Sequence, residues 1–350
     1  MSVHTDFSPR STDGVEVVDH ARWDAALSDR GCDDVYLRRG YHEASAHLEP
    51  DPAGVVLLRA AAGAGEVLLP LVVRRLPSGD AFDATSAYGY GGPWASGEAD
   101  HAAAGAAIDD WARDHGVVAT FLRFHPLLGN HAWNPSPVPP IRLGSTVEWH
   151  IGGDGDLRAG MHSHHRRAAN RADRAGLQTR VRRARDDLAG FRALYEHTMR
   201  RQEAAPFYFF PDAYWDALAR DAGGDVVLVE GLLEGEVVAS LLCIAGGGDL
   251  HYHLGATADA ARAIGASNRA FLAAAEWGRA QGLGRFHLGG GVGGDETAPL
   301  FVFKHRYDPA TPPRPFHIAK WVHDPGRYRA LTGGDSTHGF FPPWRAPAHS

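Results

Sequence analysis

The chain has 350 residues, 44% of them hydrophobic, and a formal net charge of −7. This length and composition fit two globular domains with separate cores, and the acidic balance excludes a protein that coats nucleic acid with its whole surface. Two cysteines exclude a disulfide framework. The sequence has neither an apolar run long enough to span a membrane nor a signal peptide, so we expect a cytoplasmic protein.

The first half of the chain predicts several strands and one helix in a defined order. These elements are a strand over 54–59, a Gly65-Glu66 hairpin turn, a strand over 67–73, a Gly79-Asp80 turn, an aromatic and glycine-rich segment over 88–93, an alanine-rich helix with Trp111, a stop at Gly116 and a strand over 120–124.

The second half repeats this order at similar spacing. Its elements are a strand over 225–230, a Gly235-Glu236 turn, a strand over 237–244, a Gly248-Asp249 turn, a strand from His251, an alanine-rich helix with Trp277, a stop at Gly282 and a strand over 285–288. So many landmarks in one order indicate a duplicated unit. The pattern predicts an α/β (α+β) fold of two tandem domains, each a mixed, mostly antiparallel sheet flanked by helices.

A proline-rich segment over 134–140 cannot continue a helix or strand, so it marks the end of the first unit. The expected divisions are a first domain over 14–150, a second domain over 151–335 and a tail over 336–350. Two helical segments, 160–175 and 187–201, are predicted near the start of the second domain.

The first of these helical segments is basic. Between Arg158 and Arg185 there are nine arginines and one acid, Asp173, which suits a confined contact with one polyanion. A solvated helix face is the simpler alternative. The arginines spaced to share part of the helix surface are Arg166, Arg167, Arg171 and Arg174.

A glycine-containing loop precedes the alanine-rich helix of the second half. Arg262 and Gly265 stand just before Ser267 and Asn268, where backbone N–H groups at the start of a helix could hold a pyrophosphate. The alternative is an ordinary helix start capped by one of the two polar side chains.

Three glycines over 289–291 follow the last strand of the second half, and an apolar run over 299–303 then leads to Lys304. Glycines at a strand end allow positive φ angles or close backbone approach. Lys304 beside them is a candidate to stabilise developing negative charge, although a snorkelling lysine is the alternative.

Four aromatic residues over 207–210 follow Arg200 and Arg201. They could line a pocket for a flat or anionic substrate, but core packing accounts better for most of them. Tyr208 is the best exception because it carries a hydroxyl group. The histidines over 162–165 and 251–253 lack the partner spacing of a closed metal site, so no metal is expected.

Together these segments resemble the Fem-like aminoacyltransferases, a family of duplicated GNAT-fold proteins. The resemblance covers about residues 35–330. The motifs that carry it are His251-Tyr-His-Leu-Gly-Ala, Gly265-Ala-Ser-Asn, Glu276-Trp, His287-Leu-Gly-Gly-Gly, Leu300-Phe-Val-Phe-Lys, Tyr88-Gly-Tyr-Gly-Gly-Pro and Phe121-Leu-Arg-Phe-His-Pro.

The resemblance implies an activity. The family moves an amino acid from aminoacyl-tRNA to an amine, usually of a peptidoglycan precursor and in some antibiotic pathways of a small peptidyl or nucleoside acceptor. It implies a reaction centre at Phe303 and Lys304 and tRNA contacts along the basic helix. The residues that it implies for acceptor binding are Arg201, Tyr208, Tyr252, Tyr88 and Tyr41.

Aminoacyl transfer requires no cofactor, because aminoacyl-tRNA is an already activated co-substrate, and we assign stabilisation of the oxyanion to Lys304. One alternative is an acyl-CoA-dependent GNAT N-acyltransferase, in which the loop over 262–268 would bind the pyrophosphate of a coenzyme A thioester. Another is a non-catalytic binding module. The long coiled-coil arm of some cell-wall members is missing, which favours a soluble natural-product acceptor over a lipid-linked one.

Overall fold

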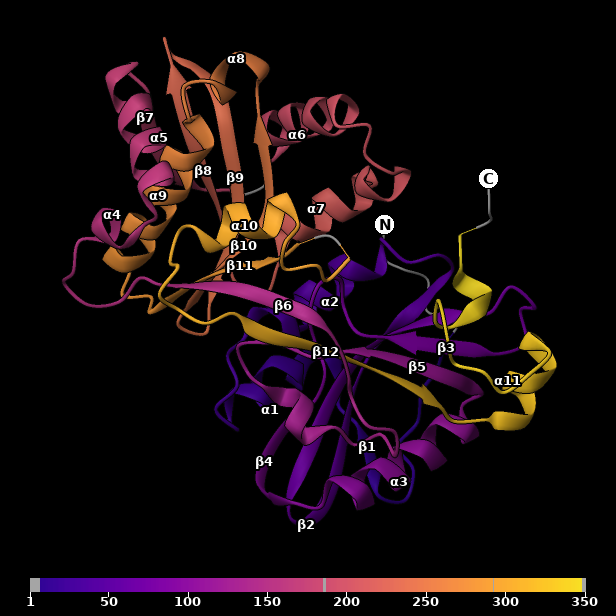
Figure 1. Cartoon of the computed structure of the whole chain (residues 1–350). Coiled ribbons are helices and arrows are strands. Elements are labelled where there is room, and N and C mark those ends of the chain that lie inside the picture. Colours follow the sequence, from indigo (N-terminus) through magenta and orange to yellow (C-terminus); the bar gives the residue numbers. More distant parts are fainter. Residues whose placement is uncertain (1–6, 185–186, 292, 348–350) are drawn as a thin grey trace. The chain divides into compact units, whose positions relative to one another are not determined.

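The computed structural model describes residues 7–184, 187–291 and 293–347 (Figure 1). The chain forms two compact units: unit 1 comprises Met1–Leu143 and Phe316–Ser350, and unit 2 comprises Gly144–Pro315. This division differs from the expected one in two places: residues 144–150 belong with the second unit, and residues 316–335 belong with the first. The reason is backbone pairing: β12 (Arg314–Val322) lies antiparallel to β5 (Val117–Arg123) in the sheet of unit 1.

The sheet of unit 1 has the strand order β1-β2-β3-β5-β12, with β4 paired to β2. The other strands of unit 1 are β1 (Val15–Val17), β2 (Pro52–Arg75), β3 (Phe82–Thr85) and β4 (Trp94–Ala99), and its helices are α1 (Trp23–Ser28), α2 (Arg39–Ala46), α3 (His101–Asp114) and α11 (Pro325–Thr332).

Strand β2 contains the hairpin that the sequence predicts. Arg59 on its first arm forms an ion pair with Glu66 on the second, and the Arg75 amide donates to the Asp51 carbonyl at 2.9 Å. The two arms are therefore antiparallel, and the chain reverses near Gly63, whose φ of 66° lies in the left-handed region. The turn thus falls about two residues before the expected Gly65-Glu66 pair.

The sheet of unit 2 has the strand order β6-β11-β10-β9-β8-β7. Its strands are β6 (Ile141–His150), β7 (Gln178–Arg183), β8 (Asp225–Leu233), β9 (Glu236–Gly246), β10 (Asp249–Thr257) and β11 (Arg285–Gly290), and its helices are α4 (Leu157–Gly160), α5 (Ser163–Arg174), α6 (Ala189–Arg201), α7 (Asp212–Arg220), α8 (Asp259–Arg262), α9 (Ala266–Ala280) and α10 (Pro299–His305).

The two units share one strand plan, which confirms the predicted duplication and the mixed sheets. In each unit a hairpin is followed by a strand that pairs in parallel with a later strand, and a helix connects the two strands. These pairs are β3 with β5, connected through α3, and β10 with β11, connected through α9. In each unit the strand beyond this parallel pair is antiparallel, β12 beside β5 and β6 beside β11.

The core of unit 2 lies between its sheet and α9. The buried face of α9 includes Ala270, Phe271 and Ala274, which pack in one cluster with Leu250 and Phe286 of the central strands. Small side chains on this face let the helix lie close to the sheet and fix its N-terminus beside the ends of β10 and β11. Within the described part of the chain, no helix combines the length and the hydropathy needed to cross a bilayer.

Candidate active site

The parallel strands β10 and β11 separate after a short pairing. The last pair between them is His251 opposite His287. Beyond it, the described residues of β10 pair only with β9, and those of β11 pair only with β6. A register shift occurs in each strand just beyond this pair, between Tyr252 and Leu254 and between His287 and Gly289. The strands therefore diverge at their carboxyl ends, the position where parallel strands usually bind ligands.

Lys304 lies at this divergence and contacts both strands. Its Nζ donates a hydrogen bond of 2.7 Å to the carbonyl oxygen of Gly290 on β11 and lies 5.3 Å from the ring centre of Tyr252 on β10. Lys304 is only 7% exposed, and burial lowers its pKa to about 7. Its ammonium group is therefore present in part at neutral pH, in surroundings where a charge interacts strongly.

The glycines beside Lys304 have the conformations that the sequence predicts. Gly289 has a φ of 73°, and a Cβ atom on Gly291 would lie 3.0 Å from the Cβ of Phe301. Residues 299–305 form a helix, α10, and do not end a strand. The missing side chain at Gly291 lets this helix pack against the end of β11, so that Lys304 reaches the Gly290 carbonyl.

Helix α10 is fastened to the basic helix α5 through its backbone. The His162 amide donates to the Arg306 carbonyl at 2.9 Å, and His165 Nε2 lies 2.7 Å from the Phe303 carbonyl. Burial lowers the pKa of His165 to about 4, so its ring is neutral, and Nε2 carries the proton because a carbonyl can only accept. The Phe303 ring packs 4.9 Å from the His165 ring. Phe303 therefore supports the position of Lys304 through packing.

The predicted pyrophosphate loop takes part in internal contacts. The Asn268 amide donates to the Tyr307 hydroxyl at 3.4 Å, and the hydroxyls of Ser267 and Thr257 lie 2.6 Å apart. Arg262 is exposed, and no described residue forms an ion pair with it. Ser267 and Asn268 thus connect the start of α9 to β10 and to Tyr307, two residues beyond α10.

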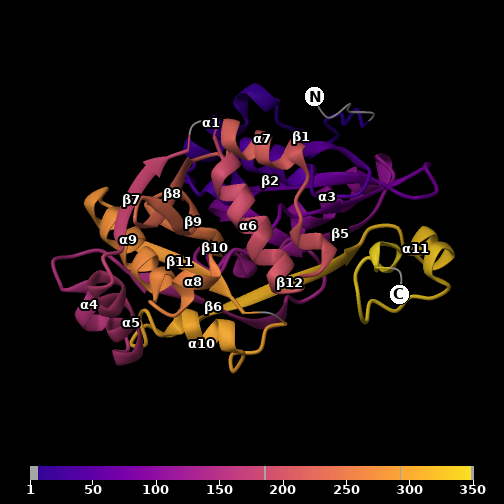
Figure 2. The ribbon, with the colours of Figure 1, turned by 90° about the horizontal axis from the view of Figure 1, so that it is seen from above.

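The N-terminus of α9 is covered by α5, and the two helices lie side by side (Figures 1 and 2). Gly265 precedes α9 with a φ of 84°, and a Cβ atom there would lie 2.6 Å from the Ala168 carbonyl oxygen. Arg171 Nε also donates to the Ala263 carbonyl at 2.8 Å. Helix α5 therefore packs where a pyrophosphate would need access to the N–H groups of the loop.

Two of the three acceptor-binding candidates of unit 2 lie along β10. Tyr252 contacts Lys304, as described above. Arg201 lies near the end of the strand, where it donates to the Thr257 carbonyl at 2.8 Å and forms an ion pair of 2.8 Å with Asp259. The structure thus brings Tyr252 to Lys304 and places Arg201, on α6, beside the far end of the same strand.

The other tyrosine candidates have different surroundings. The Tyr208 carbonyl accepts a hydrogen bond of 3.0 Å from Tyr195, and its side chain is half-buried. In unit 1, Tyr41 is fully buried and its hydroxyl donates to the Tyr88 carbonyl at 2.8 Å. Tyr41 therefore holds the 88–93 segment in place and offers no free hydroxyl in this conformation, while Tyr88 is half-buried.

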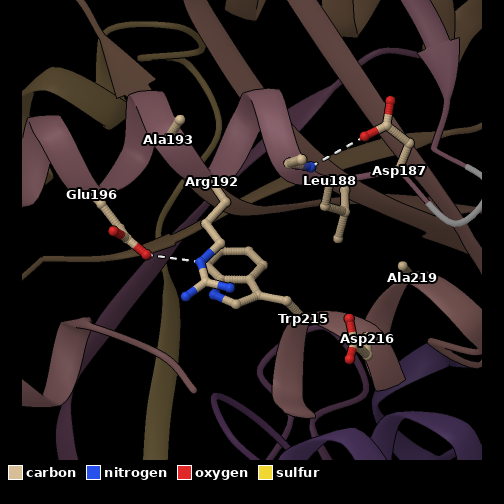
Figure 3. Close-up of a pocket in the computed structure, with 9 residues that line it drawn as sticks. Asp187, Leu188, Arg192, Ala193, Glu196, Trp215, Asp216 and Ala219 are labelled. Atoms are coloured by element: carbon tan, nitrogen blue, oxygen red, sulfur yellow. Dashed lines mark hydrogen bonds and ion pairs between the residues drawn. The ribbon is translucent and has the colours of Figure 1, made fainter. Parts of the chain in front are cut away.

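A separate cavity of about 410 Å³ lies between α6 and α7 (Figure 3). It is lined by Asp187, Leu188, Ala189, Arg192, Ala193, Glu196, Trp215, Asp216 and Ala219. One wall carries a hydrogen bond of 2.8 Å from Arg192 to Glu196. Arg201 lies nine residues beyond Arg192 on α6, which corresponds to about 13 Å along the helix axis. None of the described lining residues is a predicted site residue, so this cavity is separate from the site around Lys304.

Comparisons with known proteins agree with this architecture. Residues 159–299 match the family model described as an acetyltransferase (GNAT) domain, whereas by sequence no curated protein matches the chain. The solved structure of FemX has a TM-score of 0.62 at 13% identity, over 91% of this chain and 99% of that chain. L-PGS from Bacillus licheniformis has a TM-score of 0.53 at 15% identity, over 95% and 96% of the two chains.

A tandem GNAT protein from the clavulanic acid biosynthesis pathway, solved without AcCoA, has a TM-score of 0.50 at 12% identity, over 87% of this chain and 98% of that chain. At these identities the similarity establishes the fold: a duplicated GNAT fold of the kind seen in FemX, as the sequence motifs implied.

Proposed function

We propose that this chain, a duplicated GNAT-fold protein with the fold of FemX, is an aminoacyltransferase. It would transfer an amino acid from aminoacyl-tRNA to an amine of a peptide-like, nucleoside or other natural-product acceptor, or of a peptidoglycan precursor. The observation that carries the proposal is the place of Lys304, buried at the divergence of two parallel strands on a helix that is hydrogen-bonded to basic α5.

The reaction depends more on positioning and charge than on acid–base groups. The ester is already activated, and an α-amine with a pKa near 8 is about 10% neutral at pH 7. Its nitrogen bonds to the ester carbonyl carbon, whose oxygen becomes an oxyanion. Collapse breaks the bond to the ribose oxygen, which takes the proton released by the nitrogen. Lys304, oriented by the Gly290 carbonyl, stabilises the oxyanion.

An acyl-CoA-dependent N-acyltransferase is the competing function, and the GNAT family match over residues 159–299 favours it. The contact between Gly265 and the Ala168 carbonyl argues against it. A pyrophosphate bound at the start of α9 would require α5 to move away, whereas an RNA substrate would use the exposed side of α5 as it lies.

Ribonuclease sensitivity distinguishes the two functions. With a panel of charged tRNAs and peptide and nucleoside amines, we expect amide formation that ribonuclease abolishes, because the donor is an RNA ester. Mass spectrometry of the product provides the measurement, and inactivated ribonuclease is the control. Amide formation that survives ribonuclease and requires an acyl-CoA would refute the proposal.

A further inference from the structure

Helix α5 carries a continuous stripe of basic residues. His164, Arg167, Arg171 and Arg174 recur every three or four residues and are all exposed, while the opposite side of the helix is buried. We call these four residues the α5 stripe. At 1.5 Å per residue, the stripe is about 15 Å long.

Arg166 does not belong to the α5 stripe, although the sequence analysis grouped it with the other three arginines. Its Nη1 donates to the Ala159 carbonyl at 3.1 Å and also to the Met161 carbonyl. This half-buried side chain thus fastens the segment before α5 to the helix. Arg171 also makes one bond to a backbone carbonyl, through Nε, but its side chain is exposed and lies in line with the stripe. Arg166 is therefore left outside the α5 stripe, and we expect its neutralisation to disturb the packing of this segment.

The N-terminal end of the α5 stripe has a charge arrangement that the isolated helix disfavours. The first turn of α5 contains no acidic residue, although a helix N-terminus favours negative charge. The pKa of His164 is lowered by partial desolvation and then by the positive charges of Arg306 and Arg167, with smaller effects of His162 and Arg171. Positive charge from Arg306, Arg167 and Arg171 thus converges around His164, and a bound anion would be attracted to this place and would favour protonation of His164.

The two ends of the α5 stripe differ, because only the N-terminal end lies beside α10. The hydrogen bond between the His162 amide and the Arg306 carbonyl holds the N-terminal end of α5 beside the helix that carries Lys304. Arg174 lies at the other end of α5, in its last turn. A nucleic acid lying along the α5 stripe would therefore have one end at the reaction centre.

We propose that the α5 stripe, together with Arg306, binds the phosphodiester backbone of the donor RNA in one polarity, with the 3′ end at His164 and Arg306 and the preceding nucleotides toward Arg174. This inference rests on the proposed function, because the ester that reacts near Lys304 is at the 3′ end of the RNA. The stripe supplies phosphate contacts that position the RNA without reading its sequence.

The polarity is tested with two synthetic RNA hairpins, one with a four-nucleotide 3′ single strand and one with a blunt end. Binding to the full-length protein is measured by fluorescence anisotropy across a salt series. Arg306→Gln and Arg174→Gln are each expected to lower the salt slope by about 0.7–0.9, the value of one phosphate contact. The effect of Arg306→Gln should disappear with the blunt hairpin, and that of Arg174→Gln should persist.

Arg220→Gln is the matched control, because Arg220 is an exposed arginine in the last turn of α7. It should leave the slope unchanged, and an effect equal to those of the stripe variants would overturn the site. An effect of Arg174→Gln that is lost on the blunt hairpin while that of Arg306→Gln persists would overturn the polarity. If the wild type binds neither hairpin, the proposed function itself fails; if it binds and the stripe variants match it, only this inference fails.

Discussion

Lys304→Met is expected to slow amide formation by about 100- to 1000-fold, because a preorganised donor to an oxyanion contributes that much to the rate. Methionine keeps the length of the side chain but cannot donate the hydrogen bond or carry the charge. Single-turnover kinetics at saturating acceptor isolate this effect from binding. Near wild-type turnover in Lys304→Met would end the assignment.

The same substitution is expected to increase stability. The pKa of Lys304 is about 7 in the folded chain against an ordinary 10.5, so the unfolded state binds the proton more tightly. The lowered pKa therefore destabilises the folded state. This destabilisation is fully present below pH 7 and disappears as the pH rises to 10.5. Each pKa unit corresponds to about 1.4 kcal/mol, and loss of the bond to Gly290 offsets part of the gain.

We therefore expect the free energy of unfolding of Lys304→Met to exceed that of the wild type by about 2 kcal/mol at pH 7, and by less at pH 10. Urea unfolding at the two pH values measures the change. A variant that loses both activity and stability would show instead that Lys304 holds the site together and does not act on the reaction.

Gly265→Ala is expected to destabilise the protein by about 3 kcal/mol. The residue has a φ of 84°, which disfavours a side chain by about 1–2 kcal/mol. In addition its Cβ would lie 2.6 Å from the Ala168 carbonyl oxygen, a backbone atom that moves only if α5 moves. Urea unfolding measures the loss, and the salt slope of RNA binding reports the displacement of α5.

Gly282→Ala is the matched control for this prediction. Gly282 has a φ of 79°, and a Cβ atom there meets nothing within 4 Å, so only the backbone cost of about 1–2 kcal/mol applies. If the two variants lost equal stability, α5 would not press on the loop before α9. The packing of α5 would then no longer argue against coenzyme A binding at this loop, and calorimetric titration with coenzyme A would decide whether the loop binds it.

The duplication and the place of Lys304 were predictable because their signals are local. Turn residues, apolar runs and alanine-rich helices recur in order along the chain, and Lys304 follows the glycine edge within a short stretch. The membership of the α5 stripe was also within reach, since a helical spacing of three or four residues joins His164 to Arg167, Arg171 and Arg174 and leaves Arg166 on another face.

Other features were not predictable because they depend on backbone contacts between distant segments. The bond between His165 and the Phe303 carbonyl joins residues 138 positions apart, and a carbonyl acceptor has no sequence signature. Burial of Tyr41 follows from the packing of α2, which a tyrosine motif does not reveal. The return of β12 to unit 1 was missed because its pattern resembles that of any half-buried strand.

The return of β12 makes unit 1 depend on a late segment of the chain during synthesis. Strand β6 follows the sheet of unit 1 in the chain but completes unit 2, and β12 follows unit 2 but completes unit 1. A polypeptide ending at Leu143 would lack the neighbour of β5 and expose an unpaired edge, which invites aggregation. The portion translated first therefore has an incomplete sheet until β12 has left the ribosome, so a fragment ending at Leu143 is unsuitable for expressing unit 1, whereas unit 2 is one continuous segment, Gly144–Pro315.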